Sequence, residues 1–203
     1  MKIICIGRNY AKHAAELKND VPDQPVIFLK PETALLPKGE ALQIPAFTHD
    51  LHYECELVVK IGKTGKAIPA ADALDYIDGI TLGLDFTARD VQENLKKKSL
   101  PWELAKAFDS SAAIGDFRKI DGLGNLKNVR FTLEKNGETV QSGHTADMLF
   151  PVAEIIAFAS RYFTLQPGDA IFTGTPEGVG PVKNGDVLKG ILEGEMVFEV
   201  RIA

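Results

Sequence analysis

The clearest pattern in the chain is a regular alternation of side-chain types over residues 52–62. Four apolar positions share one side of it: Cys55, Leu57, Val59 and Ile61. The other side carries Glu54, Glu56, Val58 and Lys60. A period of two predicts a half-buried β-strand. Residues two apart in a strand point the same way and lie roughly 6.6 Å apart, so the Glu54 and Glu56 side chains are aimed at one spot.

Two neighbouring carboxylates on a strand suggest a metal site. Like charges side by side repel each other, and a divalent cation between them would remove that cost. Oxygen-only ligands favour a hard ion such as Mg²⁺, Mn²⁺ or Ca²⁺. A strand with a solvated charged face has the same pattern, so the metal interpretation needs a third oxygen ligand and a reactive group elsewhere in the chain.

The rest of the chain is predicted to form short strands and turns, with few helices. Single strands are expected at residues 2–6, 26–29, 80–86 and 169–172. The Asn136-Gly137 pair predicts a hairpin between residues 129–133 and 138–141, and a last hairpin is expected at 187–192 and 196–202. Helices are predicted at 10–18 with Asn9 as the cap, at 68–76, at 87–98 and around 151–156. Residues 102–108 are predicted to be extended.

Composition and charge narrow the class of protein. The 203 residues are 45% hydrophobic and 25% charged, which is ordinary for a soluble globular protein, and we expect one domain over residues 1–203. A net charge of −5 argues against a broad nucleic-acid or membrane surface, since both need excess Lys and Arg. A solvated helix end explains the basic run at 96–98. Two cysteines and the lack of a membrane-length apolar run lead us to expect a cytoplasmic protein.

Two further groups could supply the missing chemistry. Asp85 ends a predicted strand and is the natural third oxygen ligand, although it could also belong to the start of the following helix. His13 and Glu16 are three apart on a predicted helix, so their side chains are neighbours. A His beside a carboxylate can act as a general base, but a surface pair has the same spacing. Lys106 stands between small and aromatic residues, as a partly desolvated cation would, although an ordinary surface lysine fits the same sequence.

Six segments, taken together and in order, resemble the fumarylacetoacetate hydrolase family over almost the whole chain. They are GRNYAKHAAEL at 7–17, PVIFLKPETALL at 25–36, HYECELVVKIGK at 52–63, GLDFTARDVQ at 83–92, PWELAKAFD at 101–109 and GDAIFTGTPEGVGPV at 168–182. The chain is similar to the short branch, whose members act on acylpyruvates, oxaloacetate or related enols. The resemblance implies an α+β fold, a β-rich mixed sheet roll with a few short helices, and commonly a homodimer.

The resemblance also implies roles for individual residues. The metal carboxylates, usually holding Mg²⁺ or Mn²⁺, would be Glu54, Glu56 and Asp85. The pair that activates water would be His13 and Glu16, and the groups that stabilise the oxyanion would be Gln92 and Lys106. Substrate contacts would come from Arg8, Lys30 and Thr175. Fumarylacetoacetase itself has a fourth metal carboxylate, seven residues before the catalytic His. Ile6 stands there in this chain, which favours the short branch.

The implied activity is metal-dependent hydrolysis of the C–C bond of an acylpyruvate through a metal-bound enolate. Two alternatives stay open. One is an oxaloacetate decarboxylase or an enol–keto tautomerase, such as a 2-hydroxyhepta-2,4-diene-1,7-dioate isomerase, which needs no activated water. The other is a metal-binding protein without catalysis. The expected partner is a small 2-oxo acid.

Overall fold

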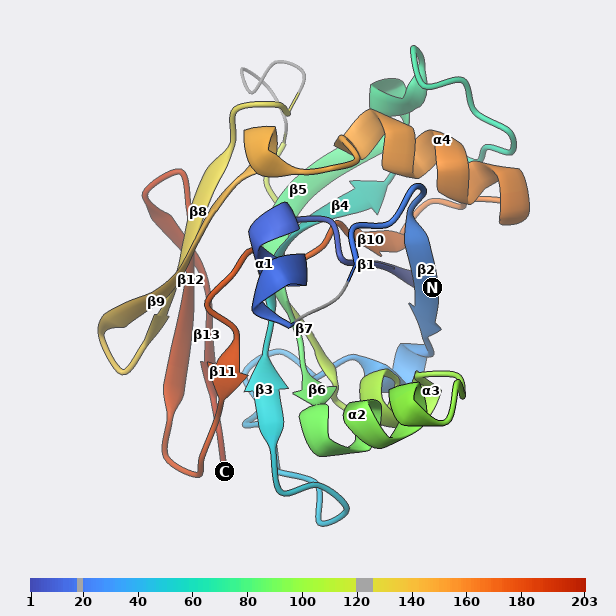
Figure 1. Ribbon diagram of the computed structural model, residues 1–203. Coiled ribbons are helices and arrows are strands. Elements are labelled where there is room, and N and C mark those ends of the chain that lie inside the picture. Colours follow the sequence, from blue (N-terminus) through green and yellow to red (C-terminus); the bar gives the residue numbers. More distant parts are fainter. Residues whose placement is uncertain (18–19, 120–125) are drawn as a thin grey trace.

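A computed structural model describes residues 1–17, 20–119 and 126–203 (Figure 1). Its largest sheet has six strands, in the order β2 (Val26–Lys30), β1 (Ile3–Gly7), β10 (Ala170–Phe172), β4 (Cys55–Ile61), β5 (Ile77–Asp85) and β7 (Ala112–Ile114). The β1–β10 pair is parallel and the other pairs are antiparallel, so the sheet is mixed. This agrees with the predicted fold class.

Two smaller sheets and four α-helices complete the fold of the described residues. One sheet has the order β11 (Gly180–Pro181), β3 (Leu51–Tyr53) and β6 (Thr87–Ala88). The other has the order β13 (Glu195–Arg201), β12 (Val187–Leu192), β8 (Arg130–Lys135) and β9 (Glu138–His144). The helices are α1 (Ala11–Glu16), α2 (Arg89–Lys97), α3 (Glu103–Lys106) and α4 (Val152–Tyr162). Short 3₁₀ turns occupy Glu32–Ala34, Ala73–Tyr76 and Thr145–Asp147. In Figure 1, α4 covers one end of the large sheet, and α2 and α3 lie beyond the other.

The alternation in β4 decides which face of the large sheet carries the site. The predicted apolar face lies in the main core, where Cys55, Leu57, Val59 and Ile61 are all fully buried. On the opposite face Val58 packs with Phe172 in a smaller apolar cluster. Glu54 and Glu56 belong to that face, and both are buried. The interpretation of this stretch as a strand with a solvated charged face is therefore wrong.

Three predicted elements differ from the structure. The helix predicted from residue 87 begins at Arg89, because Thr87 and Ala88 pair with β3 as strand β6. Residues 102–108 were expected to be extended, but Ala105 and Lys106 both donate backbone hydrogen bonds to the Trp102 carbonyl and form the short helix α3. Residues 68–76 form a helix only in their last turn. The Ile68 backbone N–H donates to Ser160 Oγ on α4 at 2.8 Å, so the start of this segment is held by α4 and not by a helical turn of its own.

Asn9 does not cap the first helix as predicted. Tyr10 occupies the cap position of α1, without a side-chain hydrogen bond. The Asn9 amide instead donates to the carbonyls of Phe150 and Thr173, and its oxygen accepts from the Phe150 N–H at 2.8 Å. Asn9 therefore joins the turn before α1 to two distant segments. Lys18, the predicted end of this helix, lies outside the described residues.

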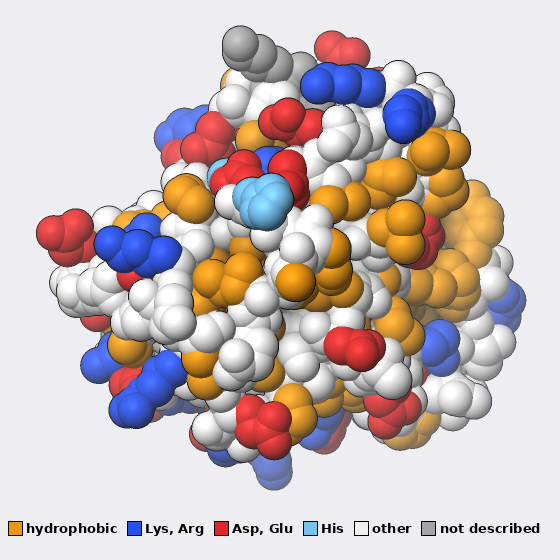
Figure 2. Space-filling model, turned by 90° about the horizontal axis from the view of Figure 1, so that it is seen from below, with side chains coloured by type: hydrophobic (Ala, Val, Ile, Leu, Met, Phe, Trp, Pro, Cys, Tyr) orange, Lys and Arg blue, Asp and Glu red, His pale blue; other side chains and the backbone are white. Residues whose placement is uncertain are grey.

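Exposed apolar side chains gather on the side of the molecule where α3 lies (Figure 2). Leu104 is 70% exposed and Phe47 53% exposed, and both line a shallow apolar hollow with Pro31, Val91, Ala107 and Phe108. Among the described residues, no helix has the length and apolar character needed to cross a membrane.

Candidate active site

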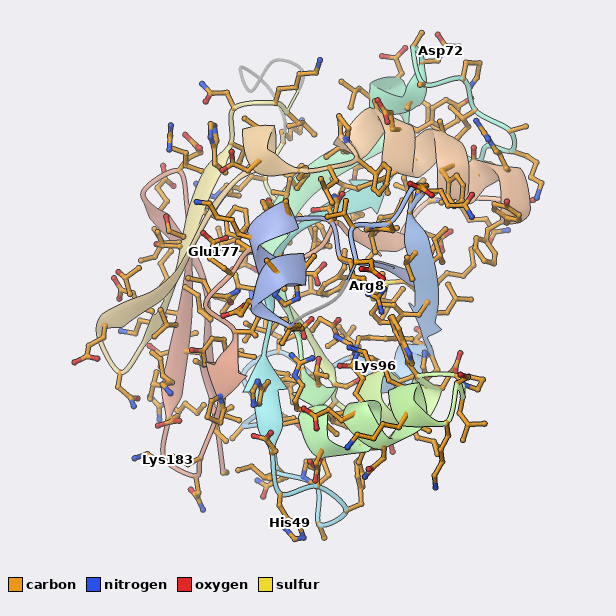
Figure 3. All side chains as sticks on the ribbon, in the orientation of Figure 1. Arg8, His49, Asp72, Lys96, Glu177 and Lys183 are labelled. Carbon is orange, nitrogen blue, oxygen red and sulfur yellow. The ribbon has the colours of Figure 1, made fainter. Side chains whose placement is uncertain are left out.

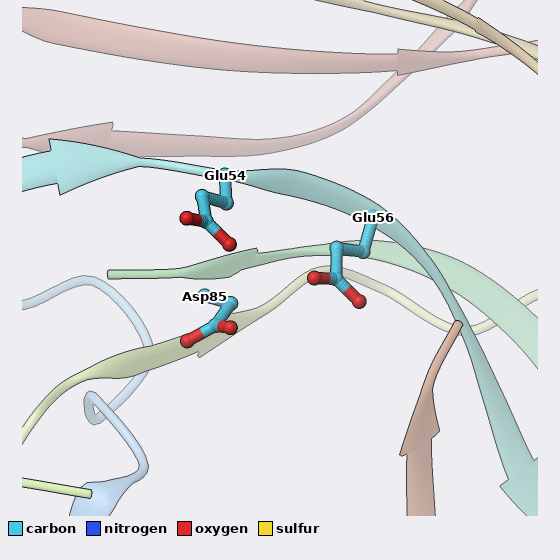
Figure 4. Close-up of side chains that lie close together, drawn as sticks. All are labelled: Glu54, Glu56 and Asp85. Carbon is cyan, nitrogen blue, oxygen red and sulfur yellow. The ribbon is translucent and has the colours of Figure 1, made fainter. Parts of the chain in front are cut away.

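Three carboxylates meet where β4 begins and β5 ends (Figure 4). Glu54 directly precedes β4, Glu56 lies on it, and Asp85 is the last residue of β5. The Asp85 backbone N–H donates to the Glu54 carbonyl at 2.8 Å, which holds the two strand ends together. One carboxylate oxygen from each residue lies within 4.8 Å of the others. The antiparallel register thus brings together the three ligands predicted from the sequence.

Two glycines let the backbone approach this carboxylate triad. Gly83 pairs with Glu56 across β4 and β5, and a Cβ there would come 2.6 Å from the Phe172 ring. Gly174 has φ +99°, a conformation that side chains disfavour, and its N–H donates to Glu56 Oε2 at 2.6 Å. Each glycine therefore fits a position where a side chain would clash with a neighbour, the Phe172 ring at Gly83 and Asn9 at Gly174.

Lys106 neutralises two members of the triad. Its Nζ donates to Glu54 Oε2 at 2.8 Å, to Asp85 Oδ2 at 2.7 Å and to Thr87 Oγ1 at 2.6 Å. Burial alone would lower the pKa of Lys106, but Asp85 and Glu54 outweigh it and raise the pKa above its ordinary value. The ammonium is therefore charged at neutral pH.

Arg89 is a second cation at the site, and it was not among the predicted site residues. Its guanidinium donates to Glu54 Oε1 and, at 2.7 Å, to Gln92 Oε1. The second contact orients the Gln92 amide with its oxygen toward Arg89. The position of Arg89, four residues after Asp85 at the start of a helix, was the sequence signal for it.

Lys30 lies beneath the triad and not on the pocket wall. Its Nζ is 2.8 Å from Asp85 Oδ1 and donates to Ser111 Oγ at 3.0 Å and to the Lys106 carbonyl. Its side chain is fully buried. These contacts fit a residue that positions Asp85 and Lys106 better than one that touches substrate.

The donor set fits a hard divalent cation. Burial raises the pKa of Glu56 well above its ordinary value, and the neighbouring Asp85 and Glu54 carboxylates raise it further. Burial also disfavours the charged form of Glu54, but Lys106 and Arg89 hold its pKa well below the ordinary value. Asp85 Oδ1 is buried and pairs with the Lys30 ammonium by charge, without a well-aligned hydrogen bond from the described residues. A bound cation would reduce the cost of ionising Glu56, and Asp85 Oδ1 could be one of its ligands.

The predicted histidine–carboxylate pair lies on the wall of the same pocket. His13 is buried, and its Nδ1 is 3.2 Å from Glu16 Oε2. The Glu16 carboxylate accepts in turn from the Gly178 N–H, at 3.1 Å and 3.3 Å. Because Nδ1 faces Glu16, the other ring nitrogen, Nε2, is the one that could act as a base. The pocket brings His13 together with the triad, although α1 and the two strands of the triad are distant in sequence.

Comparison with known proteins identifies the family. Residues 2–202 match the model described as fumarylacetoacetate (FAA) hydrolase C-terminal. The chain belongs to this family. It is 47% identical over 201 residues to "Oxaloacetate tautomerase FAHD1, mitochondrial" of Mus musculus, covering 98% of this chain and 91% of the relative. It is 44% identical over 203 residues to "Oxaloacetate decarboxylase, mitochondrial" of Dictyostelium discoideum, covering 98% and 93%.

A solved relative shows the same fold with ligands. The crystal structure of fumarylpyruvate hydrolase from Pseudomonas aeruginosa, in complex with Mn²⁺ and pyruvate, matches with a TM-score of 0.93 and 39% identity. The match covers 100% of this chain and 89% of that one. The family therefore includes hydrolase, decarboxylase and tautomerase members on a fold that this chain shares.

Thr175 was predicted to contact the substrate. It lies on the pocket wall, but its hydroxyl already makes two hydrogen bonds within the protein. It donates to the Cys55 carbonyl at 2.8 Å and accepts from Gln141 Nε2 at 2.8 Å. Gln141 Oε1 also accepts from the Cys55 N–H at 2.9 Å. The amide of Gln141, which nothing in the sequence singled out, thus ties the loop after β10 to the start of β4.

We expect Thr175→Val to destabilise the protein by about 1–2 kcal/mol, because it leaves the buried Gln141 donor and the Cys55 carbonyl each short of a partner. Urea denaturation would measure this. The control is Thr139→Val at an exposed position on β9, where a change within about 0.5 kcal/mol is expected. Equal stability of both variants would contradict a structural role for the Thr175 hydroxyl.

Proposed function

We propose that this protein is a metal-dependent enzyme that cleaves the C–C bond of an acylpyruvate by hydrolysis. The observation that carries the proposal is that His13 and the carboxylate triad line one pocket, with Glu16 paired to the His13 ring. A triad alone would suit any metal-binding protein. A general base in the same pocket is what hydrolysis requires, because the attacking water must lose a proton.

Glu54, Glu56 and Asp85 would hold Mg²⁺ or Mn²⁺. A bound divalent cation supplies a Lewis acid and an anchor for the 2-oxo acid group. His13 Nε2 takes the proton from the attacking water, and Glu16 fixes the ring tautomer and stabilises the imidazolium.

The remaining residues act on the charge of the transition state. The Gln92 amide donates to the oxyanion that forms at the attacked carbonyl. Lys106 lines the same pocket, and its positive charge would favour the same oxyanion. The C–C bond then breaks, the enolate takes up the proton that His13 removed from the water, and the products are pyruvate and a carboxylic acid.

Decarboxylation or tautomerisation of oxaloacetate is a second candidate. The names of the relatives from Mus musculus and Dictyostelium discoideum favour it, at 47% and 44% identity. Both reactions pass through an enolate of the 2-oxo acid, so the same metal ligands would serve. Neither needs an activated water, and this is the difference that experiment can use.

Removal of the metal is expected to abolish turnover of acetylpyruvate and of oxaloacetate. Enzyme treated with a chelator and dialysed should regain activity when Mg²⁺ or Mn²⁺ is added, because three carboxylates cannot anchor an anionic substrate without a cation between them. Zn²⁺ is expected to restore little, since the part of the chain that the structure describes places no Cys or His ligand among the three carboxylates. Full activity of the metal-free enzyme would refute the proposed mechanism.

We also propose that the protein is a homodimer, as the family resemblance implies. The exposed Leu104 and Phe47 support self-association, because contiguous exposed apolar groups often mark interfaces. Sedimentation at micromolar concentration should give twice the chain mass of 22.1 kDa. A clean monomer would contradict this expectation.

A further inference from the structure

One buried glutamine behind the pocket wall holds two segments of the site together. Gln141 lies on β9 in the four-stranded sheet and is 2% exposed. Its Oε1 accepts from the Cys55 N–H at 2.9 Å, and its Nε2 donates to Thr175 Oγ1 at 2.8 Å and to the Pro176 carbonyl at 3.0 Å. An apolar side chain of the same length would fill the same space, so packing alone does not require an amide here.

The loop that Gln141 contacts, residues 173–178, presents backbone N–H groups to two carboxylates of the site. The Gly174 N–H donates to Glu56 Oε2 at 2.6 Å. The Gly178 N–H faces both oxygens of Glu16, at 3.1 Å and 3.3 Å. Glu56 belongs to the carboxylate triad, and Glu16 is the partner of the His13 ring. One loop therefore contacts both the metal ligands and the base pair, although these come from β4 and α1.

The path of this loop is fixed from outside, by β4 and β9. Gly174 and Gly178 have φ of +99° and +95°, so the loop turns sharply at both N–H groups. A Cβ at Gly178 would come 2.3 Å from the Val140 carbonyl oxygen, which shows how closely the loop lies against β9. Gln141 contacts residues 175 and 176, midway between the two glycines. Its amide is therefore placed to set the direction of both N–H groups.

The contact with α1 depends mainly on the Gly178 N–H. The same loop also carries Glu177, which forms an ion pair with Lys12 of α1 at 3.4 Å, and Figure 3 shows Glu177 beside this helix. Both side chains of the pair are exposed, and an exposed ion pair contributes little to stability. The loop adds Thr175 to the pocket wall, which other elements supply with Arg8 and His13. A shift of the loop would therefore reach Glu16 first, through the lost hydrogen bond.

We propose that Gln141 is a positioning residue of the active site, which holds the loop so that Gly174 aligns Glu56 and Gly178 aligns Glu16 at the same time. Gln141 does not touch the reacting groups and acts through the loop backbone. The effect on Glu56 concerns metal binding and can be measured without turnover. The effect on Glu16 rests on the proposed function, since only hydrolysis needs a base that activates water.

The test uses Gln141→Met, which keeps the length of the side chain and removes its hydrogen bonds. Calorimetric titration should show Mn²⁺ affinity lower by about threefold to tenfold, at or below the loss for a group that contacts a ligand directly. Amide hydrogen exchange over residues 173–179 should be faster than in wild type. With saturating Mn²⁺, kcat should fall several-fold more for acetylpyruvate hydrolysis than for oxaloacetate decarboxylation, as expected for Glu16→Gln.

Ser160→Ala is the matched control for loss of a buried polar group. The Ser160 hydroxyl accepts from the Ile68 N–H at 2.8 Å and donates to the Ala157 carbonyl at 2.9 Å, on α4. Its loss should lower stability while leaving Mn²⁺ affinity, the ratio of the two rates and exchange over the loop unchanged. If Gln141→Met does not fold, Thr175→Val removes an acceptor of the same amide and should give the same fall in Mn²⁺ affinity and the same faster exchange.

The outcomes separate this proposal from the proposed function. Mn²⁺ affinity equal to that of wild type, or loop exchange no faster than in Ser160→Ala, would overturn the proposal and leave Gln141 as a residue that only stabilises the fold. Lower Mn²⁺ affinity with equal losses in the two rates would overturn the link to Glu16. A wild-type protein that binds Mn²⁺ but hydrolyses no acylpyruvate would refute the proposed function, whereas the affinity and exchange results would still decide the link to Glu56.

Discussion

Glu56→Gln is expected to weaken Mn²⁺ binding by more than about 100-fold, because loss of even an outer-shell partner costs 10–100-fold. Turnover of acetylpyruvate and of oxaloacetate should fall together, since both reactions need the metal. The substitution keeps the side-chain shape, and the amide oxygen can still accept from the Gly174 N–H. Calorimetric titration with Mn²⁺ and rates for both substrates would measure the effect. Near-normal Mn²⁺ affinity would remove Glu56 from the ligand set.

The same variant should be more stable than wild type when both are metal-free. Burial and the charges of Asp85 and Glu54 raise the Glu56 pKa above the value of 4.5 that applies in the unfolded chain. The folded state therefore binds this proton more tightly than the unfolded state does. The contribution of Glu56 to stability is fully present below pH 4.5 and is lost as pH rises through the raised pKa of the folded state. A glutamine at this position carries no charge at any pH, so the stability of the variant does not fall in this way as pH rises.

Thermal denaturation across pH, with and without Mn²⁺, would check this. The metal-free difference in Tm between Glu56→Gln and wild type should grow as pH rises, and Mn²⁺ should reverse the order because only wild type binds it well. Glu138→Gln, at an exposed position on β9, is the control for loss of a surface charge. A metal-free variant less stable than wild type at neutral pH would show that Glu56 is ionised there at little cost.

His13→Gln is expected to reduce acetylpyruvate hydrolysis by at least about 100-fold, the usual contribution of a general base. Decarboxylation of oxaloacetate should lose much less, because it needs the metal and not an activated water. Glu16→Gln should show the same difference more weakly, since Glu16 only orients and stabilises the ring of His13. The measurement is kcat for both substrates in wild type and the two variants.

Two controls make this comparison decisive. His49→Gln changes an exposed histidine far from Arg8 and the pocket (Figure 3) and should leave both rates unchanged. Mn²⁺ affinity of His13→Gln should equal that of wild type, which shows that the metal site is intact. Equal losses in the two reactions would mean that His13 serves a shared step, such as protonation of the enol. That result would favour the tautomerase candidate over hydrolysis.

The sequence by itself determined the parts of the site that depend on local periodicity. The alternation around Glu54 and Glu56 fixed which side chains share a face, because the period of two is a property of the strand and not of its neighbours. The end of a second apolar strand likewise marked Asp85. The spacing of His13 and Glu16 required only one helical turn. All of these features could be predicted without knowing which strands pair.

Only the tertiary structure decided how these pieces meet. The β4–β5 register brings Asp85 to Glu54, and packing places Lys30 beneath Asp85 and not on the pocket wall. Short segments such as 68–76 and 102–108 were misjudged because their backbone partners are set by packing and turns, and their own propensities are weak. The pocket itself is lined by residues of α1, β4, β5 and α2, which are distant in sequence. No local pattern could reveal it, since side-chain contacts between distant segments exist only once the chain has folded.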